Sequence, residues 1–151
     1  MAFSSLILSF LLAQAGSDAS AIRVLGADFF ASDSEHPGSA PVSTRQIAHR
    51  PGSSCYEWVV RVMPVARSVT VREVFRLPSA APQWGVDPAR TQVSDDGRES
   101  VTEIAEDLSD GMISNGWCVA EGDPVGRYRI SVFDGDRLIQ RFDFEVQLET
   151  Y

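Results

Sequence analysis

The residues of this chain with the most definite chemistry are its two cysteines, Cys55 and Cys118. In a protein that leaves the cytosol, two cysteines most simply oxidise to a single disulfide bond. The competing chemistry is nucleophilic catalysis, because His49 precedes Cys55 by six residues and an imidazole can activate a thiol. A catalytic thiol would have to stay reduced outside the cytosol, in the presence of a second cysteine. We therefore predict a disulfide between Cys55 and Cys118.

The first 15 residues indicate the compartment. Residues 6–13, LILSFLLA, form a short apolar run, and Ala13-Gln14-Ala15 follows with small residues where a signal peptidase cleaves. The run is too short to cross a bilayer as a helix, although residues 1–5 lack the Lys or Arg that usually precede it. The alternative is a buried N-terminal element of a cytosolic protein. We expect residues 1–15 to be a signal peptide and residues 16–151 to form one periplasmic or secreted domain, with no stable membrane span in the mature form.

The charge of the chain limits its partners. It contains 13 arginines, no lysine and 21 acidic residues, which gives a formal net charge of −8. An acidic surface repels phosphate backbones and anionic lipid headgroups. We therefore expect neither nucleic acid nor an anionic membrane as a partner.

Motifs for other chemistries do not occur. The sequence has no serine-hydrolase elbow and no zinc-binding, dinucleotide-binding or phosphate-loop pattern. Residues 33–36, which end in His36, could ligate a cation weakly, and residues 95–110 hold seven acids of the kind that calcium requires. We predict a solvated loop for the first segment and a solvated acidic strand edge for the second, with calcium binding as the alternative there. We expect no enzymatic activity, no cofactor and no metal.

The candidate binding residues are Trp84, Asp87 and Arg90. They lie in residues 79–96, the longest predicted connection, and Trp84 is the only tryptophan outside a predicted strand. An exposed tryptophan in a proline-rich loop could anchor a partner protein or stack on a sugar ring. The alternative is that Trp84 folds back and covers one end of the domain.

The elements that must position these residues are short β-strands. Proline and glycine interrupt the chain often, and no stretch of ten residues keeps a helical apolar period. The clearest element is a C-terminal hairpin with Asp134-Gly135 at its turn, where apolar and polar residues alternate on both sides. Its second strand is predicted to face the core with four residues: Leu138, Phe142, Phe144 and Val146.

The remaining strands are predicted within residues 22–30, 42–48, 55–62, 69–77, 101–108 and 117–120. Trp58 and Trp117 lie in two of them and are expected in the core. Glu73 interrupts an apolar strand face, which indicates a bulge or a buried ion pair. Asn115-Gly116 is predicted to form a turn. The total of about seven or eight strands indicates an antiparallel β-sandwich.

The C-terminal segment also carries a resemblance. Residues 126–136, GRYRISVFDGD, followed by residues 141–146, RFDFEV, resemble the final hairpin of bacterial immunoglobulin-like domains. The whole chain is similar to small exported bacterial proteins of this architecture. The resemblance implies an immunoglobulin-like β-sandwich, a fold that serves binding or assembly more often than catalysis.

The cysteines depart from the antibody pattern, in which a core tryptophan lies well after the first cysteine and a tyrosine precedes the second by two residues. Here Trp58 follows Cys55 by three residues and Gly116 occupies the tyrosine position. We therefore do not expect the usual bridge between the two sheets.

These observations predict an exported, non-enzymatic module that binds another envelope or extracellular protein through residues 79–96 and one sheet edge. The alternative is a carbohydrate-binding module that uses Trp84 with Asp87 and Arg90. A hydrolytic enzyme is the third hypothesis, although no base–nucleophile pair is recognisable in the sequence.

Overall fold

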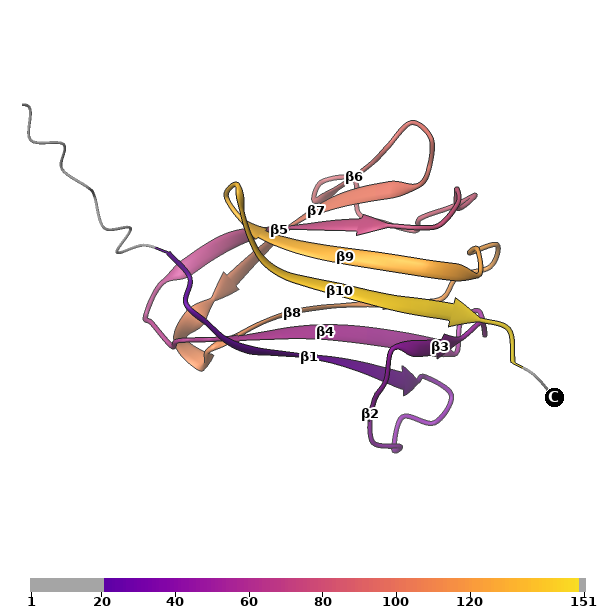
Figure 1. Cartoon of the computed structure of the whole chain (residues 1–151), viewed down its shortest axis with the longest axis horizontal. Coiled ribbons are helices and arrows are strands. Elements are labelled where there is room, and N and C mark those ends of the chain that lie inside the picture. Colours follow the sequence, from indigo (N-terminus) through magenta and orange to yellow (C-terminus); the bar gives the residue numbers. More distant parts are fainter. Residues whose placement is uncertain (1–20, 150–151) are drawn as a thin grey trace, which may run out of the picture.

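The computed structural model describes residues 21–149, so the predicted signal peptide lies outside the described residues. Within that range the chain forms ten strands in two sheets that face each other (Figure 1). The first sheet has the order β2-β1-β4-β8, with β1 (Val24–Asp33), β2 (Val42–Ser43), β4 (Ser54–Val62) and β8 (Met112–Cys118). The second has the order β3-β10-β9-β5-β7-β6, with β3 (Gln46–Ala48), β5 (Ser68–Arg76), β6 (Thr91–Val93), β7 (Glu99–Asp107), β9 (Gly126–Asp134) and β10 (Arg137–Gln147).

The predicted antiparallel sandwich is confirmed, with one exception in direction and a higher strand count. The strand pairs are antiparallel except β3, which runs parallel to the end of β10. Three strands, β2, β3 and β6, have only two or three residues each, too few for alternation to reveal. A short 3-10 turn (Leu108–Asp110) connects β7 to β8. Between residues 21 and 149 no helix is long and apolar enough to cross a membrane.

The core forms where the apolar faces of the two sheets meet. Phe142 and Phe144 are 0% and 4% exposed, which confirms the predicted inward face of β10. Phe144 packs against Phe29 and Tyr56 of the first sheet, with ring centroids 4.7 and 4.8 Å apart. At the start of β9, the Tyr128 hydroxyl donates a hydrogen bond of 2.6 Å to the Pro124 carbonyl, the tyrosine-corner contact of immunoglobulin-like sandwiches.

Two sequence-based predictions about strands are wrong. Leu138 does not face the core: it is 49% exposed, because a bulge between Leu138 and Gln140 shifts the register and packs Ile139 against the core instead. Asn115-Gly116 is not a turn but lies inside β8, opposite Trp58 and Glu57. Gly116 lacks the positive φ that such a turn requires.

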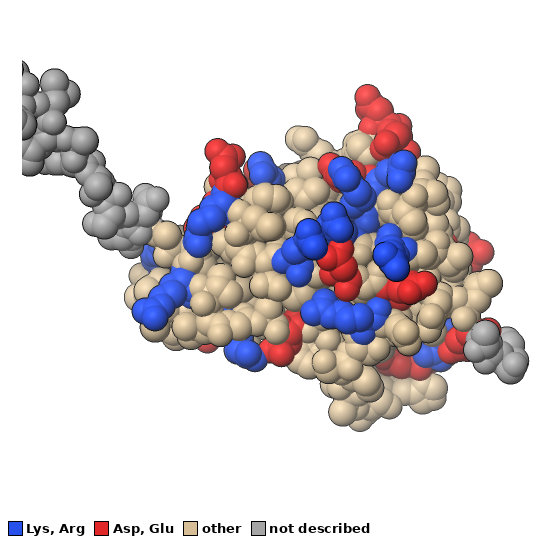
Figure 2. Space-filling view, viewed as in Figure 1, with Lys and Arg blue, Asp and Glu red and all other residues tan. Residues whose placement is uncertain are grey.

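The surface carries interspersed charges. Figure 2 shows arginines and acidic residues mixed on the face towards the viewer. On the outer face of the second sheet, Asp143 pairs with Arg129 and Arg141 at 2.7 and 2.9 Å. These side chains are about half exposed. Exposed pairs of this kind contribute little to stability and keep the surface hydrated.

Candidate functional site

The two cysteines form a disulfide bond across neighbouring strands of one sheet. Cys55 in β4 and Cys118 in β8 are directly opposite each other, with their Cα atoms 3.9 Å apart. The bridge therefore does not join the two sheets, as the departure from the antibody pattern predicted. Cys55 carries no free thiol, and the Nε2 atom of His49 lies 2.8 Å from the Asp123 carbonyl oxygen. This arrangement is incompatible with a Cys55–His49 catalytic pair.

A hollow of about 430 Å³ lies beside β8, an edge strand of the first sheet. Residues 84–91 and the inner side of β8 form much of its wall. All three binding residues predicted from the sequence line it: Trp84, Asp87 and Arg90. The structure adds Asn115, Trp117 and Cys118, which sequence reasoning did not propose as site residues.

Trp84 is neither fully exposed nor fully folded back onto the domain, the two alternatives that the sequence left open. Its indole Nε1–H donates to the Gly97 carbonyl at 3.0 Å, and its ring meets Phe75 edge to face at 5.7 Å. The ring of Trp117 is also roughly perpendicular to it, at 6.2 Å. Trp84 is half-buried, so part of the ring packs on the core while part lines the hollow.

Behind the hollow lies a buried carboxylate, Glu73 of β5, with 0% exposure. It accepts hydrogen bonds from the indole nitrogens of Trp58 and Trp117, the second at 3.0 Å. The Asn115 amide nitrogen also donates to both carboxylate oxygens, at 3.2 and 3.3 Å. The predicted bulge or buried ion pair at Glu73 is wrong, because β5 keeps its register with both neighbours and these donors are neutral N–H groups.

Burial raises the pKa of the Glu73 carboxyl above its ordinary value, and the three N–H donors oppose that rise. The contacts also fix the floor of the hollow. Since the indole N–H groups of Trp84 and Trp117 are both bonded within the protein, their rings offer the hollow only apolar carbon surface. One feature of the sequence could have indicated these contacts. Glu73 is an acid on an apolar strand face, and a buried acid requires hydrogen-bond donors somewhere in the fold.

The rim of the hollow is charged. Arg90 is exposed, and within residues 21–149 its guanidinium has no hydrogen-bond or ion-pair partner. The Asp87 carboxylate is also exposed and accepts a hydrogen bond from the Ala89 backbone N–H at 2.9 Å. An apolar aromatic wall therefore adjoins a cation and an anion that are both available to a ligand.

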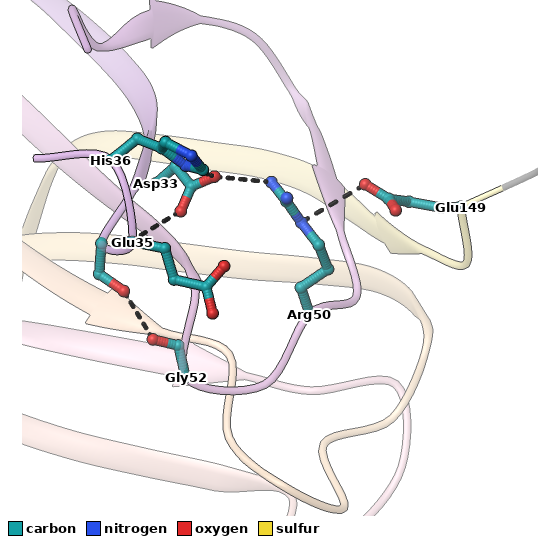
Figure 3. Close-up of polar contacts among 7 residues, drawn as sticks. Asp33, Glu35, His36, Arg50, Gly52 and Glu149 are labelled. Carbon is teal, nitrogen blue, oxygen red and sulfur yellow. Dashed lines mark hydrogen bonds and ion pairs between the residues drawn. The ribbon is translucent and has the colours of Figure 1, made fainter.

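In the first segment considered for cation binding, Asp33 and His36 are engaged in contacts within the protein (Figure 3). The Nδ1 atom of His36 lies 3.2 Å from Asp33, which also pairs with Arg50 at 3.4 Å. The backbone N–H of Glu35 and then the His36 side chain lower the pKa of Asp33. In the second segment, β7 is not a free edge, because β6 pairs with part of it. No three His, Cys, Asp or Glu residues are placed to hold a metal ion in the part of the chain that the structure describes.

Comparison with known proteins places the fold in a family. The family model for the PM0630 beta sandwich domain matches residues 27–147, and the chain belongs to this family. Among solved structures, it is similar to an immunoglobulin-like protein from Pseudomonas aeruginosa, with 17% sequence identity and a TM-score of 0.55. That match covers 84% of this chain and 97% of the other. No curated protein sequence matches significantly. The chain is thus an immunoglobulin-like β-sandwich, and the resemblance to small bacterial proteins of that fold is confirmed.

Proposed function

We propose that this chain is an exported, non-enzymatic module that binds another envelope or extracellular protein at the hollow beside β8. The observation that carries the proposal is an aromatic wall, Trp84 and Trp117, beside Arg90, whose guanidinium has no partner in the part of the chain that the structure describes. Tryptophan and arginine are the residues that most often dominate the energy of protein interfaces. A rigid wall also binds with a smaller loss of side-chain entropy.

The chemistry of the hollow supports binding over catalysis. Its cysteine is oxidised, and neither histidine lines it. Glu73 is the nearest buried acid, but both of its oxygens are directed at N–H donors behind the wall. Export is supported by the disulfide, since such bonds persist in oxidising compartments, and by the predicted signal peptide.

A carbohydrate-binding module is the second candidate, because Trp84, Asp87 and Arg90 share one hollow. A sugar requires several hydrogen bonds around the ring that stacks on the tryptophan. Here the two indole N–H groups and the Asn115 amide N–H are already bonded within the protein. A sugar hydroxyl cannot bond to these groups, whereas apolar side chains of a protein partner pack on the indole carbon surfaces without hydrogen bonds, which favours the protein.

Site-specific photocrosslinking in the native host tests this proposal. A photoreactive residue replaces Val86, which lines the hollow, or as a control Thr70, which is exposed on β5 of the other sheet. We expect one envelope or extracellular protein to crosslink from position 86 and not from position 70, with a lower yield when Arg90→Ala is added. Identical products from both positions would contradict the proposal. Glycan-array binding that Trp84→Ala abolishes, without a protein crosslink, would support the carbohydrate candidate.

A further inference from the structure

The outer edge of β8 carries backbone groups that have no partner among residues 21–149. Val119 N–H donates to Ser54 C=O at 2.8 Å, and Val62 N–H donates to Gly111 C=O at 2.9 Å. Because antiparallel ladders alternate, the odd-numbered residues of β8 bond to β4 and the even-numbered ones direct N–H and C=O outwards. β4 is the only neighbour of β8 within residues 21–149.

The available part of this edge is short and well defined. The outward N–H of Met112 is already bonded to the Asp110 carboxylate at 3.1 Å. Ser114, Gly116 and Cys118 remain, with three N–H and three C=O groups that have no partner among the described residues. A row of alternating backbone donors and acceptors is matched by another extended peptide, and by few other ligands.

The same edge borders the hollow. Asn115 and Trp117 project from the inner side of β8 and line the hollow together with Gly116 and Cys118. In an added strand, the residues opposite Asn115 and Trp117 would place their side chains on that inner side. These two side chains would enter the hollow against the carbon surfaces of Trp84 and Trp117, which suits apolar groups.

On the outer face of the first sheet, Gly116 has no side chain that could cover the neighbouring acid, Glu57. Gly116 is not in the left-handed region, and a Cβ there would meet only the Tyr56 carbonyl at 3.4 Å and Glu57 Cβ at 3.9 Å, so the backbone does not require glycine. Glu57 lies directly opposite on β4, is exposed, and has no ion-pair partner among the described residues. A residue of an added strand opposite Gly116 would lie about 10 Å from Glu57, two strand spacings away, which an arginine or lysine can bridge.

We propose that the partner binds by strand addition: an extended segment with the pattern apolar–basic–apolar pairs with residues 114–118 of β8. Its two apolar side chains occupy the hollow, and its basic side chain crosses Gly116 to reach Glu57. The net charge of −8 also favours a basic segment. This inference rests on the proposed function for its location, and it specifies the chemistry of the partner.

Selection from a random linear peptide phage library on the full, disulfide-bonded chain tests the proposal. We expect the selected peptides to share a basic residue flanked on both sides by apolar ones. A synthetic peptide of the consensus sequence should bind Ser114→Pro about tenfold more weakly, since this change removes an outward N–H and no internal hydrogen bond. Val93→Pro is the matched control, because its N–H points outwards from β6, at the free edge of the other sheet. Glu57→Gln should reduce affinity several-fold and weaken its salt dependence, whereas Glu103→Gln on β7 should not.

Amide hydrogen exchange provides a measurement that needs no proline variant. Saturating peptide should slow exchange at Ser114, Gly116 and Cys118 of the wild-type chain and leave Asn115 and Trp117 unchanged, because those two amides already bond to β4. No selected binder, a consensus without alternation, or unchanged exchange at the three even-numbered amides would overturn strand addition. If Arg90→Ala still weakens peptide binding while Ser114→Pro does not, the hollow remains the binding site and only the mode of binding is wrong.

Discussion

The carboxylate of Glu73 in β5 accepts a hydrogen bond of 3.0 Å from the indole nitrogen of Trp117 in β8, across the interface between the two sheets. Trp58 of β4 donates to the same carboxylate. This polar contact inside an apolar core holds one wall of the candidate binding hollow in place. It also makes the stability of the fold depend on pH.

Glu73 should make the protein less stable as pH rises. Because its pKa is raised in the folded state, the folded chain holds the proton above the ordinary pKa of 4.5 while the unfolded chain releases it. The stabilising contribution is therefore complete below pH 4.5 and is lost as pH rises through the folded-state pKa. Urea unfolding at several pH values should show the stability advantage of wild type over Glu73→Gln shrinking across this range. An advantage that grows with pH would contradict the assignment.

Removal of the disulfide should be costly. Cys55 and Cys118 are separated by 63 residues, so the bridge restricts a long loop of the unfolded chain. Replacing both with serine should lower the free energy of unfolding by about 4 kcal/mol. Non-reducing peptide mapping of natively exported protein should recover the linked peptides. Two freely alkylated thiols would rule out the bond.

Neighbouring positions in β10 should differ sharply in their effect on stability. Phe142→Ala should cost about 3–5 kcal/mol because the ring is fully buried. Leu138→Ala and Arg141→Ala should each cost less than about 1 kcal/mol, since both side chains are exposed. A large loss at Leu138 would mean that the bulge is misplaced.

Variants at two residues of the hollow should distinguish effects on partner binding from effects on stability. Arg90→Ala should weaken partner binding without changing the melting temperature, because the guanidinium has no partner within residues 21–149. Trp84→Ala should weaken binding and also cost about 1–3 kcal/mol, since the ring packs on Phe75 and Trp117. Unchanged binding in both variants would exclude the hollow as the interface.

The sequence was informative where structure depends on local alternation. Period-two patterns identified β4, β9 and most of β10, and Trp84, Asp87 and Arg90 could be grouped because they share one loop. Contacts between segments that are far apart in the sequence could not be predicted from it. The donors to Glu73 lie 15, 42 and 44 residues away, so nothing local indicates how its charge is accommodated.

The same limit explains the errors at Asn115-Gly116 and Leu138. Asn115 is suited to β8 because its amide meets Glu73 from the other sheet, a reason that no dipeptide preference contains. The bulge at Leu138 depends on how β10 pairs with β9 beyond their turn. In both cases tertiary contacts overrode a local signal.

The Glu73 contacts also bear on the order of folding. The donors come from β4 and β8, whereas the acceptor comes from β5, so the contacts cannot assemble before the two sheets dock. Each hairpin and ladder can form earlier from its own neighbours. We therefore expect Glu73→Gln to accelerate unfolding while leaving the refolding rate nearly unchanged, as for contacts absent from the transition state. The residues that shape the binding wall would then be among the last to reach their native positions.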